Sequence, residues 1–263
     1  MLTLYTSLFT LADQDPSKNH YFYMLLIWLS HVKRFAQLWT NDQVFVLIDT
    51  RTADFANQSI FLNKILKDFP CPIQFLLHDP PKTMLDGTLQ RYKMFQPFEI
   101  LLYLDVDILV VKSLHSILFH TKPNSLCVHP EGFLKDDNYG AYLTQKNIPI
   151  APEAVGASSG KFIITNQRTR DLLFGLILRE AMSNNNPFYT LDQPYYNACF
   201  YALLKKSEIQ VDATLFRETL SINLHNMSNS TVLIDCMGEP GNGLLHLHKL
   251  VGVMTMFSAD QHP

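Results

Sequence analysis

Two aspartates, Asp105 and Asp107, lie inside the most apolar stretch of the chain. The residues before them are Ile-Leu-Leu-Tyr-Leu and those after them Ile-Leu-Val-Val, a pattern typical of a strand buried on both faces of a sheet. Charges are costly inside such a strand, so we expect the pair at its carboxyl end, where open α/β sheets bind ligands. Carboxylates at positions i and i+2 of an extended backbone share one side and repel each other unless a cation lies between them. The pair therefore predicts a site for Mg²⁺ or Mn²⁺ shared with substrate phosphates.

The segments before the pair predict the sheet that would position it. Apolar, strand-like runs at 2–7, 44–48 and 73–77 alternate with helical patterns at 20–38 and 54–69. This β-α-β-α-β order favours a parallel sheet covered by helices. The later part of the chain continues the alternation, with an irregular, Gly- and Pro-containing segment at 129–152 that we expect to shape a binding loop. Its predicted strands are 126–128, 161–164, 211–216, 231–234 and 244–249, and its predicted helices are 89–95, 169–182 and 191–206.

Composition bounds the class of protein. The chain has 263 residues, enough for one α/β domain, and its net charge of −3 gives no electrostatic basis for binding nucleic acid. The longest apolar run, 21–29, is too short to span a membrane, and the first residues lack the basic start of a signal peptide. The four cysteines are too widely spaced for a zinc motif and suit reduced, packed thiols. We therefore expect a cytoplasmic protein without a transmembrane segment. The cysteines are Cys71, Cys127, Cys199 and Cys236.

Polar residues at the predicted strand ends are further candidates. Thr6 and Asp49 follow the first two strands, where the base and ribose of a nucleotide would bind by the switch-point rule. Lys93 is placed to contact a phosphate or sugar, although a solvated surface lysine explains it nearly as well. His246 and His248 alternate in the predicted final strand, and neutral imidazole is a good ligand for Mn²⁺.

Four elements of the chain resemble glycosyltransferase family 8, the glycogenin-like and galactinol-synthase-like enzymes. Residues 103–110, Tyr-Leu-Asp-Val-Asp-Ile-Leu-Val, are similar to the family's Asp-x-Asp element. Residues 158–164 and 192–197 are similar to its Asn-Ser-Gly and Asp-Gln-x-x-hydrophobic-Asn elements, and residues 244–248 to its histidine-bearing strand. The four occur in the family's order along the chain. Compact members without a membrane anchor occur in bacteria and large DNA viruses, and the chain resembles that kind.

The resemblance implies a Rossmann-like A-type fold, a single α/β domain with a mixed, mostly parallel sheet flanked by helices. It would comprise a nucleotide-binding half (1–107), an acceptor and metal-completing half (108–250) and a tail (251–263). The implied activity is metal-dependent transfer of a sugar from a nucleoside-diphosphate donor, first of all a UDP-sugar, to a hydroxyl of a glycan or glycoprotein. The resemblance implies that the anomeric configuration is retained. The oligomeric state is open, and a homodimer is one alternative. The assigned residues are Asp105, Asp107, His246 and His248 for Mn²⁺ or Mg²⁺; Asp192 and Gln193 for catalytic contacts to the sugar; and Thr6, Asp49, Lys93, Lys249, Ser159 and Gly160 for other donor contacts.

The chain also departs from the family's pattern. Ser158 replaces an asparagine, and the usual Lys-Pro-Trp near the end is absent, which leaves Lys249 for its phosphate role. These departures keep open a module that binds nucleotide sugars or glycans without turnover. A dehalogenase-type phosphatase also uses Asp-x-Asp, but Leu109 stands where that class has Thr or Val, and no later acidic motif follows.

Overall fold

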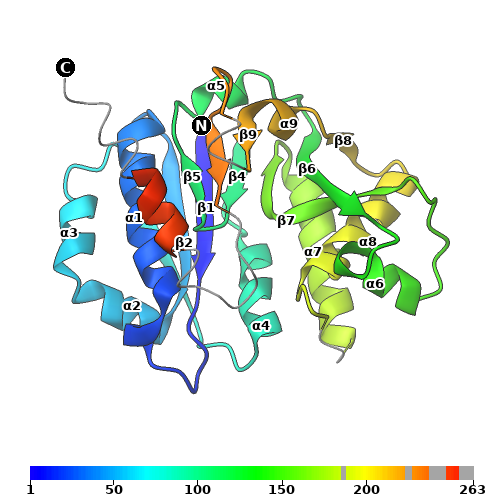
Figure 1. Cartoon of the computed structure of the whole chain (residues 1–263), viewed down its shortest axis with the longest axis horizontal. Helices are drawn as coiled ribbons and strands as arrows, with labels where there is room; N and C mark the ends of the chain where they lie inside the picture. Colours follow the sequence, from blue (N-terminus) through cyan, green and yellow to red (C-terminus); the bar gives the residue numbers. More distant parts are fainter. Residues whose placement is uncertain (185–187, 223–226, 237–246, 255–263) are drawn as a thin grey trace.

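Parallel strands from the first hundred residues form one side of the largest sheet (Figure 1). The computed structural model describes residues 1–184, 188–222, 227–236 and 247–254. Within them, seven strands form one sheet in the order β3-β2-β1-β4-β7-β6-β8, parallel throughout except that β7 is antiparallel to both neighbours. This confirms the expected α/β class with a mixed, mostly parallel sheet. The strands are β1 (Leu2–Leu8), β2 (Gln43–Asp49), β3 (Ile73–His78), β4 (Ile100–Leu104), β6 (Ser125–Phe133), β7 (Val155–Ile164) and β8 (Gln210–Asp212).

A second, three-stranded sheet has the order β5-β10-β9. Strand β10 runs antiparallel to β5, and Asp235 pairs with Ile108 at the end nearest the two aspartates. The sheet thus returns a late segment of the chain to the Asp105–Asp107 region. Its strands are β5 (Ile108–Val110), β9 (Leu220–Ser221) and β10 (Leu233–Asp235).

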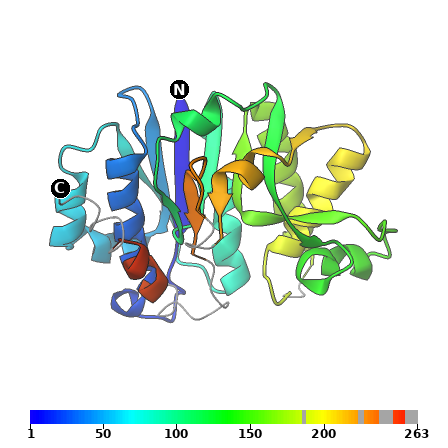
Figure 2. The same cartoon turned by 45° about the horizontal axis from the view of Figure 1, so that its top comes forward.

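Helices cover both faces of the large sheet. The α-helices are α1 (His20–Phe35), α2 (Thr50–Asn57), α3 (Ile60–Leu66), α4 (Met84–Thr88), α5 (His115–Leu118), α6 (Asp137–Gln145), α7 (Gln167–Ser183), α8 (Gln193–Lys205) and α9 (Leu215–Thr219). Two 3₁₀ helices are η1 (Pro16–Lys18) and η2 (Leu89–Lys93). Residues 247–254 are helical as well and lie beside α1 in both views (Figures 1 and 2).

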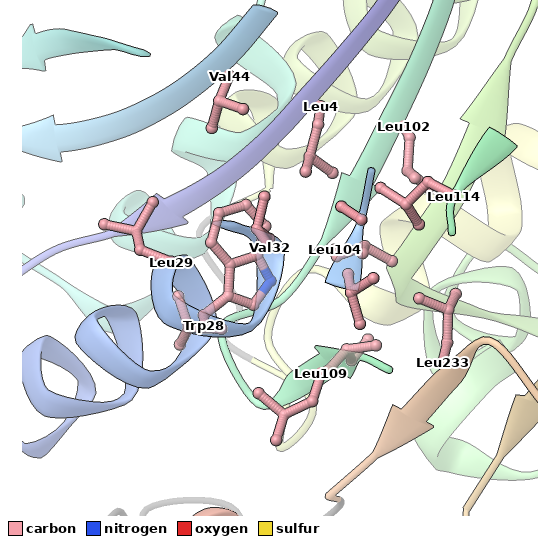
Figure 3. Packing of buried hydrophobic residues seen from close by; sticks show 14 of the residues in the cluster. Leu4, Trp28, Leu29, Val32, Val44, Leu102, Leu104, Leu109, Leu114 and Leu233 are labelled. Carbon is pink, nitrogen blue, oxygen red and sulfur yellow. The ribbon is translucent and has the colours of Figure 1, made fainter. Parts of the chain in front are cut away.

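Two apolar clusters fill the space on either side of the large sheet. In the first, Trp28 and Val32 of α1 face Leu4 and Leu104 of the sheet, and Leu233 of the small sheet closes the cluster (Figure 3). The second lies on the opposite face, under η2, α7, α8 and α6. Because side chains alternate along a strand, the same strands supply both clusters. The fully buried residues of the second cluster include Tyr5, Tyr92, Tyr103, Phe162, Phe174, Tyr195 and Tyr196.

Three of the predicted elements were wrong. The helix expected at 54–69 is two helices, because Ser59 caps the second one and accepts a hydrogen bond from the N–H of Leu62. The irregular segment expected at 129–152 contains the end of β6 and helix α6. Residues 211–216 divide between β8 and α9.

The predicted final strand at 244–249 was also wrong where the structure describes it. Residues 244–246 lie outside the described residues, and residues 247–254 are helical. Leu250 and Val253 are buried in the first cluster, with Leu247 and Met254 packed against it. This spacing of three and four residues is that of one helix face, not of a strand.

All four cysteines are buried free thiols, as the sequence predicted. Among the described residues, no helix combines the length and apolar character needed to cross a membrane.

Candidate functional site

A tight turn separates the two apolar runs around the aspartates. The N–H of Ile108 donates to the carbonyl oxygen of Asp105 (3.0 Å), so the chain leaves the large sheet after Leu104 and enters the small sheet at Ile108. The single continuous strand predicted from the apolar pattern is therefore two strands in two sheets. As expected, the pair lies just beyond the carboxyl end of β4, but the turn replaces the extended backbone that would put both carboxylates on one side.

Asp105 contacts the residues on the α7–α8 side of the sheet. Its carboxylate accepts a hydrogen bond from the hydroxyl of Tyr103 and lies 3.3 Å from the Nη1 of Arg91. The Tyr103 hydroxyl is also 3.0 Å from the Oγ of Ser7 at the end of β1. The guanidinium of Arg91 lies over the ring of Tyr103 at 5.1 Å. Asp105 is thus held by Tyr103 of β4 and Arg91 of η2, and Ser7 of β1 in turn contacts Tyr103.

Burial and neighbouring charges both act on the ionisation of Asp105. Burial raises the pKa of Asp105 to about 6; Arg91 opposes that rise and the negative charge of Asp107 adds to it. The same carboxylates act on Arg91: burial alone would lower its pKa, but Asp105 and Asp192 outweigh burial and raise it well above its ordinary value. Arg91 is therefore a fixed cation, and it does not by itself offset the nearby carboxylates.

Ser159 and Gly160 of β7 lie directly against this site. The N–H of Asp105 donates to the carbonyl oxygen of Gly160 (2.8 Å), and Arg91 donates to the carbonyl oxygen of Ser159 (2.9 Å). A Cβ on Gly160 would lie 2.6 Å from the Oδ2 of Asp105, closer than real Cβ contacts come. The absence of a side chain at Gly160 therefore gives the Asp105 carboxylate its place.

Asp192 and Gln193 come from the start of α8, on the other side of Arg91. The Oδ2 of Asp192 accepts a hydrogen bond from the hydroxyl of Tyr92 (2.6 Å) and lies 3.8 Å from the Nε of Arg91. The Oε1 of Gln193 accepts from the N–H of Ser159 (3.2 Å) and from its hydroxyl (3.4 Å). Both residues thus belong to the network around Asp105, with their oxygens engaged by protein groups.

Asp107 lies toward the small sheet, where a second group of charges begins. The Nζ of Lys161 is 2.5 Å from the Oδ2 of Asp235 and 3.9 Å from the Oε2 of Glu131. The side chains of Lys161 and Asp235 are only 3% and 5% exposed, so neither charge is shared with solvent. Asp107 lies within electrostatic reach of both Lys161 and Asp235. Its carbonyl oxygen accepts a hydrogen bond from the N–H of Cys236 (3.0 Å). Asp105 thus contacts Tyr103 and Arg91, whereas Asp107 lies within electrostatic reach of Lys161 and Asp235 as well as of Asp105.

The remaining predicted contacts of the first half are more scattered. Thr6 is buried two residues before the end of β1, and its hydroxyl has no hydrogen-bond partner among the described residues. Asp49 is buried and caps α2, accepting from the N–H groups of Thr10 (2.8 Å) and Thr52 (3.0 Å). Lys93 is exposed, within electrostatic reach of His78. The structure does not bring these residues into the Asp105 network.

The predicted histidine ligands lie at or beyond the limits of the described chain. His246 is outside the described residues, and His248 is exposed in the helix 247–254. Lys249, also exposed, is within electrostatic reach of Cys236, next to Asp235. In the described part of the chain, no three His, Cys, Asp or Glu side chains converge as a metal-binding group.

Several residues of the site had no role assigned from the sequence, above all Lys161 and Asp235. Each is a charged residue in an otherwise apolar strand, Lys161 before Phe-Ile-Ile and Asp235 after Val-Leu-Ile. Such a charge needs a partner, which is the signal that was available. The sequence does not say that the partners are each other, because 74 residues separate them.

Comparison with known proteins supports the fold. No family model and no curated protein matches the chain. Solved structures do match it. The apo bifunctional glycosyltransferase WbbM has a TM-score of 0.63 and 14% identity over 98% of this chain, which spans 51% of that protein. The galactosyltransferase LgtC, in complex with donor and acceptor sugar analogs, has a TM-score of 0.59 and 17% identity, over 96% of both chains. Apo mouse xyloside xylosyltransferase 1 has a TM-score of 0.54 and 10% identity, over 91% of this chain and 97% of that one. The chain thus has the A-type glycosyltransferase fold.

Proposed function

We propose that the chain transfers a sugar from a nucleoside-diphosphate donor, a UDP-sugar first, to a hydroxyl of a glycan or glycoprotein acceptor, with retention of configuration. The observation that supports this most is the position of the Asp105–Asp107 turn. It lies at the carboxyl end of β4 in a sheet whose neighbouring structures are glycosyltransferases, and Arg91, Ser159 and Gln193 converge on its Asp105 side. Open α/β sheets bind ligands at this edge.

We propose that Asp105 and Asp107 would hold a divalent cation together with the donor diphosphate. Asp105 and Asp107 offer hard oxygen ligands, and the pKa of Asp105 is raised by burial, with the negative charge of Asp107 adding to the rise. A bound Mn²⁺ or Mg²⁺ would neutralise charge on the leaving diphosphate. Lys249 is the proposed basic contact to the diphosphate from the C-terminal side. His246 stays a predicted ligand outside the described residues.

The α8 side of the site would position the donor sugar. The hydrogen bonds from Ser159 fix the Oε1 of Gln193, so its amide nitrogen is the group left to meet a sugar hydroxyl. Asp192 is fixed by Tyr92 and Arg91, and its carboxylate would accept from a second hydroxyl. Positioning of this kind accelerates transfer because the reacting groups are already oriented.

The direct test is release of nucleoside diphosphate from a panel of UDP- and GDP-sugars in the presence of Mn²⁺. Asp105→Asn and Asp107→Asn should each reduce release by about 100-fold or more, because charge stabilisation at the leaving group is lost. Asp54→Asn is the matched control, since Asp54 is an exposed aspartate on α2. Near-normal turnover by the Asp105 and Asp107 variants would refute the assignment.

One observation favours the second candidate, a module that binds nucleotide sugars without turnover. The carboxylate of Asp192 and the Oε1 of Gln193 both accept hydrogen bonds from protein groups. These acceptor atoms are therefore already occupied before a substrate binds. The same panel separates the two functions. A thermal shift with UDP, but no nucleotide release from any donor, would favour the binding module.

A further inference from the structure

The edge of the large sheet opposite the Asp105 turn carries an exposed tryptophan. Asp42 directly precedes β2 and accepts a hydrogen bond from the N–H of Leu2 (2.8 Å) at the start of β1, so it lies at the amino ends of the parallel strands. Asp105, in contrast, follows the carboxyl end of β4. Trp39 is 52% exposed, and its N–H also donates to Asp42 (2.8 Å). Helix α5 lies at this edge too, near the N terminus (Figure 1).

Two aromatic rings are held here by one buried carboxylate. The Oδ2 of Asp42 accepts from the N–H of Trp39 and lies 3.1 Å from the Nε2 of His115, the first residue of α5. Asp42 is fully buried, and the side chain of His115 is only 11% exposed. The imidazole of His115 stacks on the indole of Trp39, with ring centroids 3.8 Å apart and planes inclined by 12°. The orientation of an exposed indole is therefore fixed before any ligand binds.

One face of the Trp39 indole remains open. His115 covers the other face, so the exposed part of Trp39 lies on the open face and on the ring edge. Phe119, which is 79% exposed, follows His115 by four residues and lies on the same side of the helical turn. Thr40 and Asn41 are exposed and adjoin Trp39 in the chain, so groups that can hydrogen-bond a ligand are close by.

The size of this surface decides what kind of ligand it fits. Trp39 and Phe119 together expose on the order of 200–300 Å², because one whole aromatic side chain covers about 150–250 Å². A specific protein interface needs about 800 Å² from each partner, so the two rings are too small to hold a folded protein. A sugar ring matches them better. A pyranose presents C–H groups on its faces, which the electron-rich face of an indole attracts, and hydroxyls around its edge.

We propose that Trp39 and His115 form a carbohydrate-binding platform, on which one pyranose of a glycan stacks at the edge of the sheet opposite the Asp105 turn. Phe119 lies beside the platform for the neighbouring sugar of the same glycan. His115 acts as a positioning residue, because it supports the indole from behind and is itself held by Asp42. Such a platform would bind glycans whether or not the chain transfers sugar.

The test is saturation-transfer difference NMR with three probes, lactose, maltose and chitobiose. At least one of them should receive saturation at its ring C–H protons, whereas sorbitol, which has no ring face, should not. Trp39→Ala should weaken binding of that probe by about tenfold or more, and Trp39→Tyr should retain most of it. His115→Ala should weaken binding by about threefold to tenfold, since the indole loses the ring on which it stacks.

Phe61→Ala is the matched control, because Phe61 is a 73% exposed aromatic residue on α3 and its loss should leave binding unchanged. No saturation transfer to any of the three probes would overturn the proposal. Equal affinity of Trp39→Ala and the unmodified protein would overturn it as well.

A measurement on the unmodified protein keeps the proposal testable if the variants do not fold. Trp28 is fully buried, so iodide should quench the fluorescence of Trp39 alone among the two tryptophans. The bound probe should protect Trp39 from iodide, and sorbitol should not. Unchanged quenching at a saturating probe concentration would refute the platform. Protection that depends only on protein concentration would show that a second copy of the chain covers Trp39, and would also refute it. Neither experiment needs sugar transfer, so absent donor turnover counts only against the proposed function.

Discussion

Among single residues, Gly160 leaves open the space that the Asp105 carboxylate occupies. We expect Gly160→Ala to displace that carboxylate, because the added Cβ would lie 2.6 Å from Oδ2. A misplacement of this size should lower kcat/KM for donor turnover by about tenfold to 100-fold. Gly175→Ala is the control. Its Cβ meets nothing within 4 Å in α7, and alanine should stabilise that helix by about 1 kcal/mol. Unchanged kinetics in Gly160→Ala would show that the carboxylate tolerates the contact.

Asp105 also predicts a pH dependence of stability. Its pKa is about 6 in the folded protein against an ordinary 3.8, so between these values the folded state holds a proton that the unfolded state has released. Its contribution to stability is therefore present below pH 3.8 and is lost as pH rises to about 6.

The measurement is the free energy of unfolding of the unmodified protein minus that of Asp105→Asn, with a chelator present. This difference should fall as pH rises from about 4 to about 6 and stay level above that, since the asparagine does not titrate. A difference that is constant over this interval would mean that Asp105 has an ordinary pKa.

Several candidate residues selected from the sequence lie close together in the structure, but their partners were not predicted. Asp105, Ser159, Gly160, Asp192 and Gln193 do converge, and the order of motifs was enough to select them. Their contacts with Arg91 and Tyr92 were not foreseeable, because these contacts depend on how η2 packs against the rest of the fold. The contact between Lys161 and Asp235 needed the small sheet, which the linear pattern does not reveal.

At the scale of elements, hydrogen bonds of Asn197 connect α8 to β7. Its Oδ1 accepts from the N–H of Ala157 (2.7 Å), and its Nδ2 donates to the carbonyl oxygen of the same residue (2.9 Å). Asn197 is fully buried, so these two backbone groups have no water to replace it. The contact holds the start of α8, which carries Gln193, at a fixed distance from Ser159.

We expect Asn197→Ala to destabilise the protein by about 2–4 kcal/mol, because it leaves both backbone groups of Ala157 unsatisfied. Asn63→Ala is the matched control, since Asn63 is exposed in α3 and alanine is the better helix former. Urea unfolding measures both changes. Equal stabilities of the two variants would contradict a stabilising role for the Asn197–Ala157 hydrogen bonds.

Helices and strands with strongly apolar sequences were predicted well. Elements whose bounds depend on a helix cap or on tertiary packing were not. The central parallel strands are apolar throughout because both faces are buried, and this pattern is hard to mistake. Helix α6 has a polar sequence with a glycine, and it is stabilised by burying Tyr142 and Leu143 in the second cluster. Tertiary contacts of that kind leave no local signal at their own position.

For the whole molecule, the shared strands predict cooperative unfolding. Leu102 and Leu104 of β4 belong to the first apolar cluster, while Leu101 and Tyr103 belong to the second. Both clusters pack on the large sheet, so loss of one cluster would expose a face of strands that the other cluster also needs. The strand β10 adds a late segment to the first cluster, which links the two halves of the chain.

We therefore expect one unfolding transition in urea for both halves. Tryptophan fluorescence reports the first half, since Trp28 and Trp39 both lie there, and far-UV circular dichroism reports helices throughout. The two curves should coincide, as two-state unfolding requires. Separate midpoints would show that residues 1–107 and 108–250 unfold independently.

The rate at which the four buried thiols are alkylated can report ligand binding. Burial raises the pKa of Cys71 and Cys236 to about 12 and that of Cys127 to about 11, and it raises the pKa of Cys199 as well. Alkylating reagents attack thiolates, so modification must wait until the fold opens. A compound that stabilises the closed fold slows alkylation of the thiols, whether or not the protein turns that compound over. Thiol alkylation can therefore rank sugar nucleotides as ligands before any acceptor is known, and Cys236, whose N–H donates to the carbonyl oxygen of Asp107, lies beside the proposed cation site.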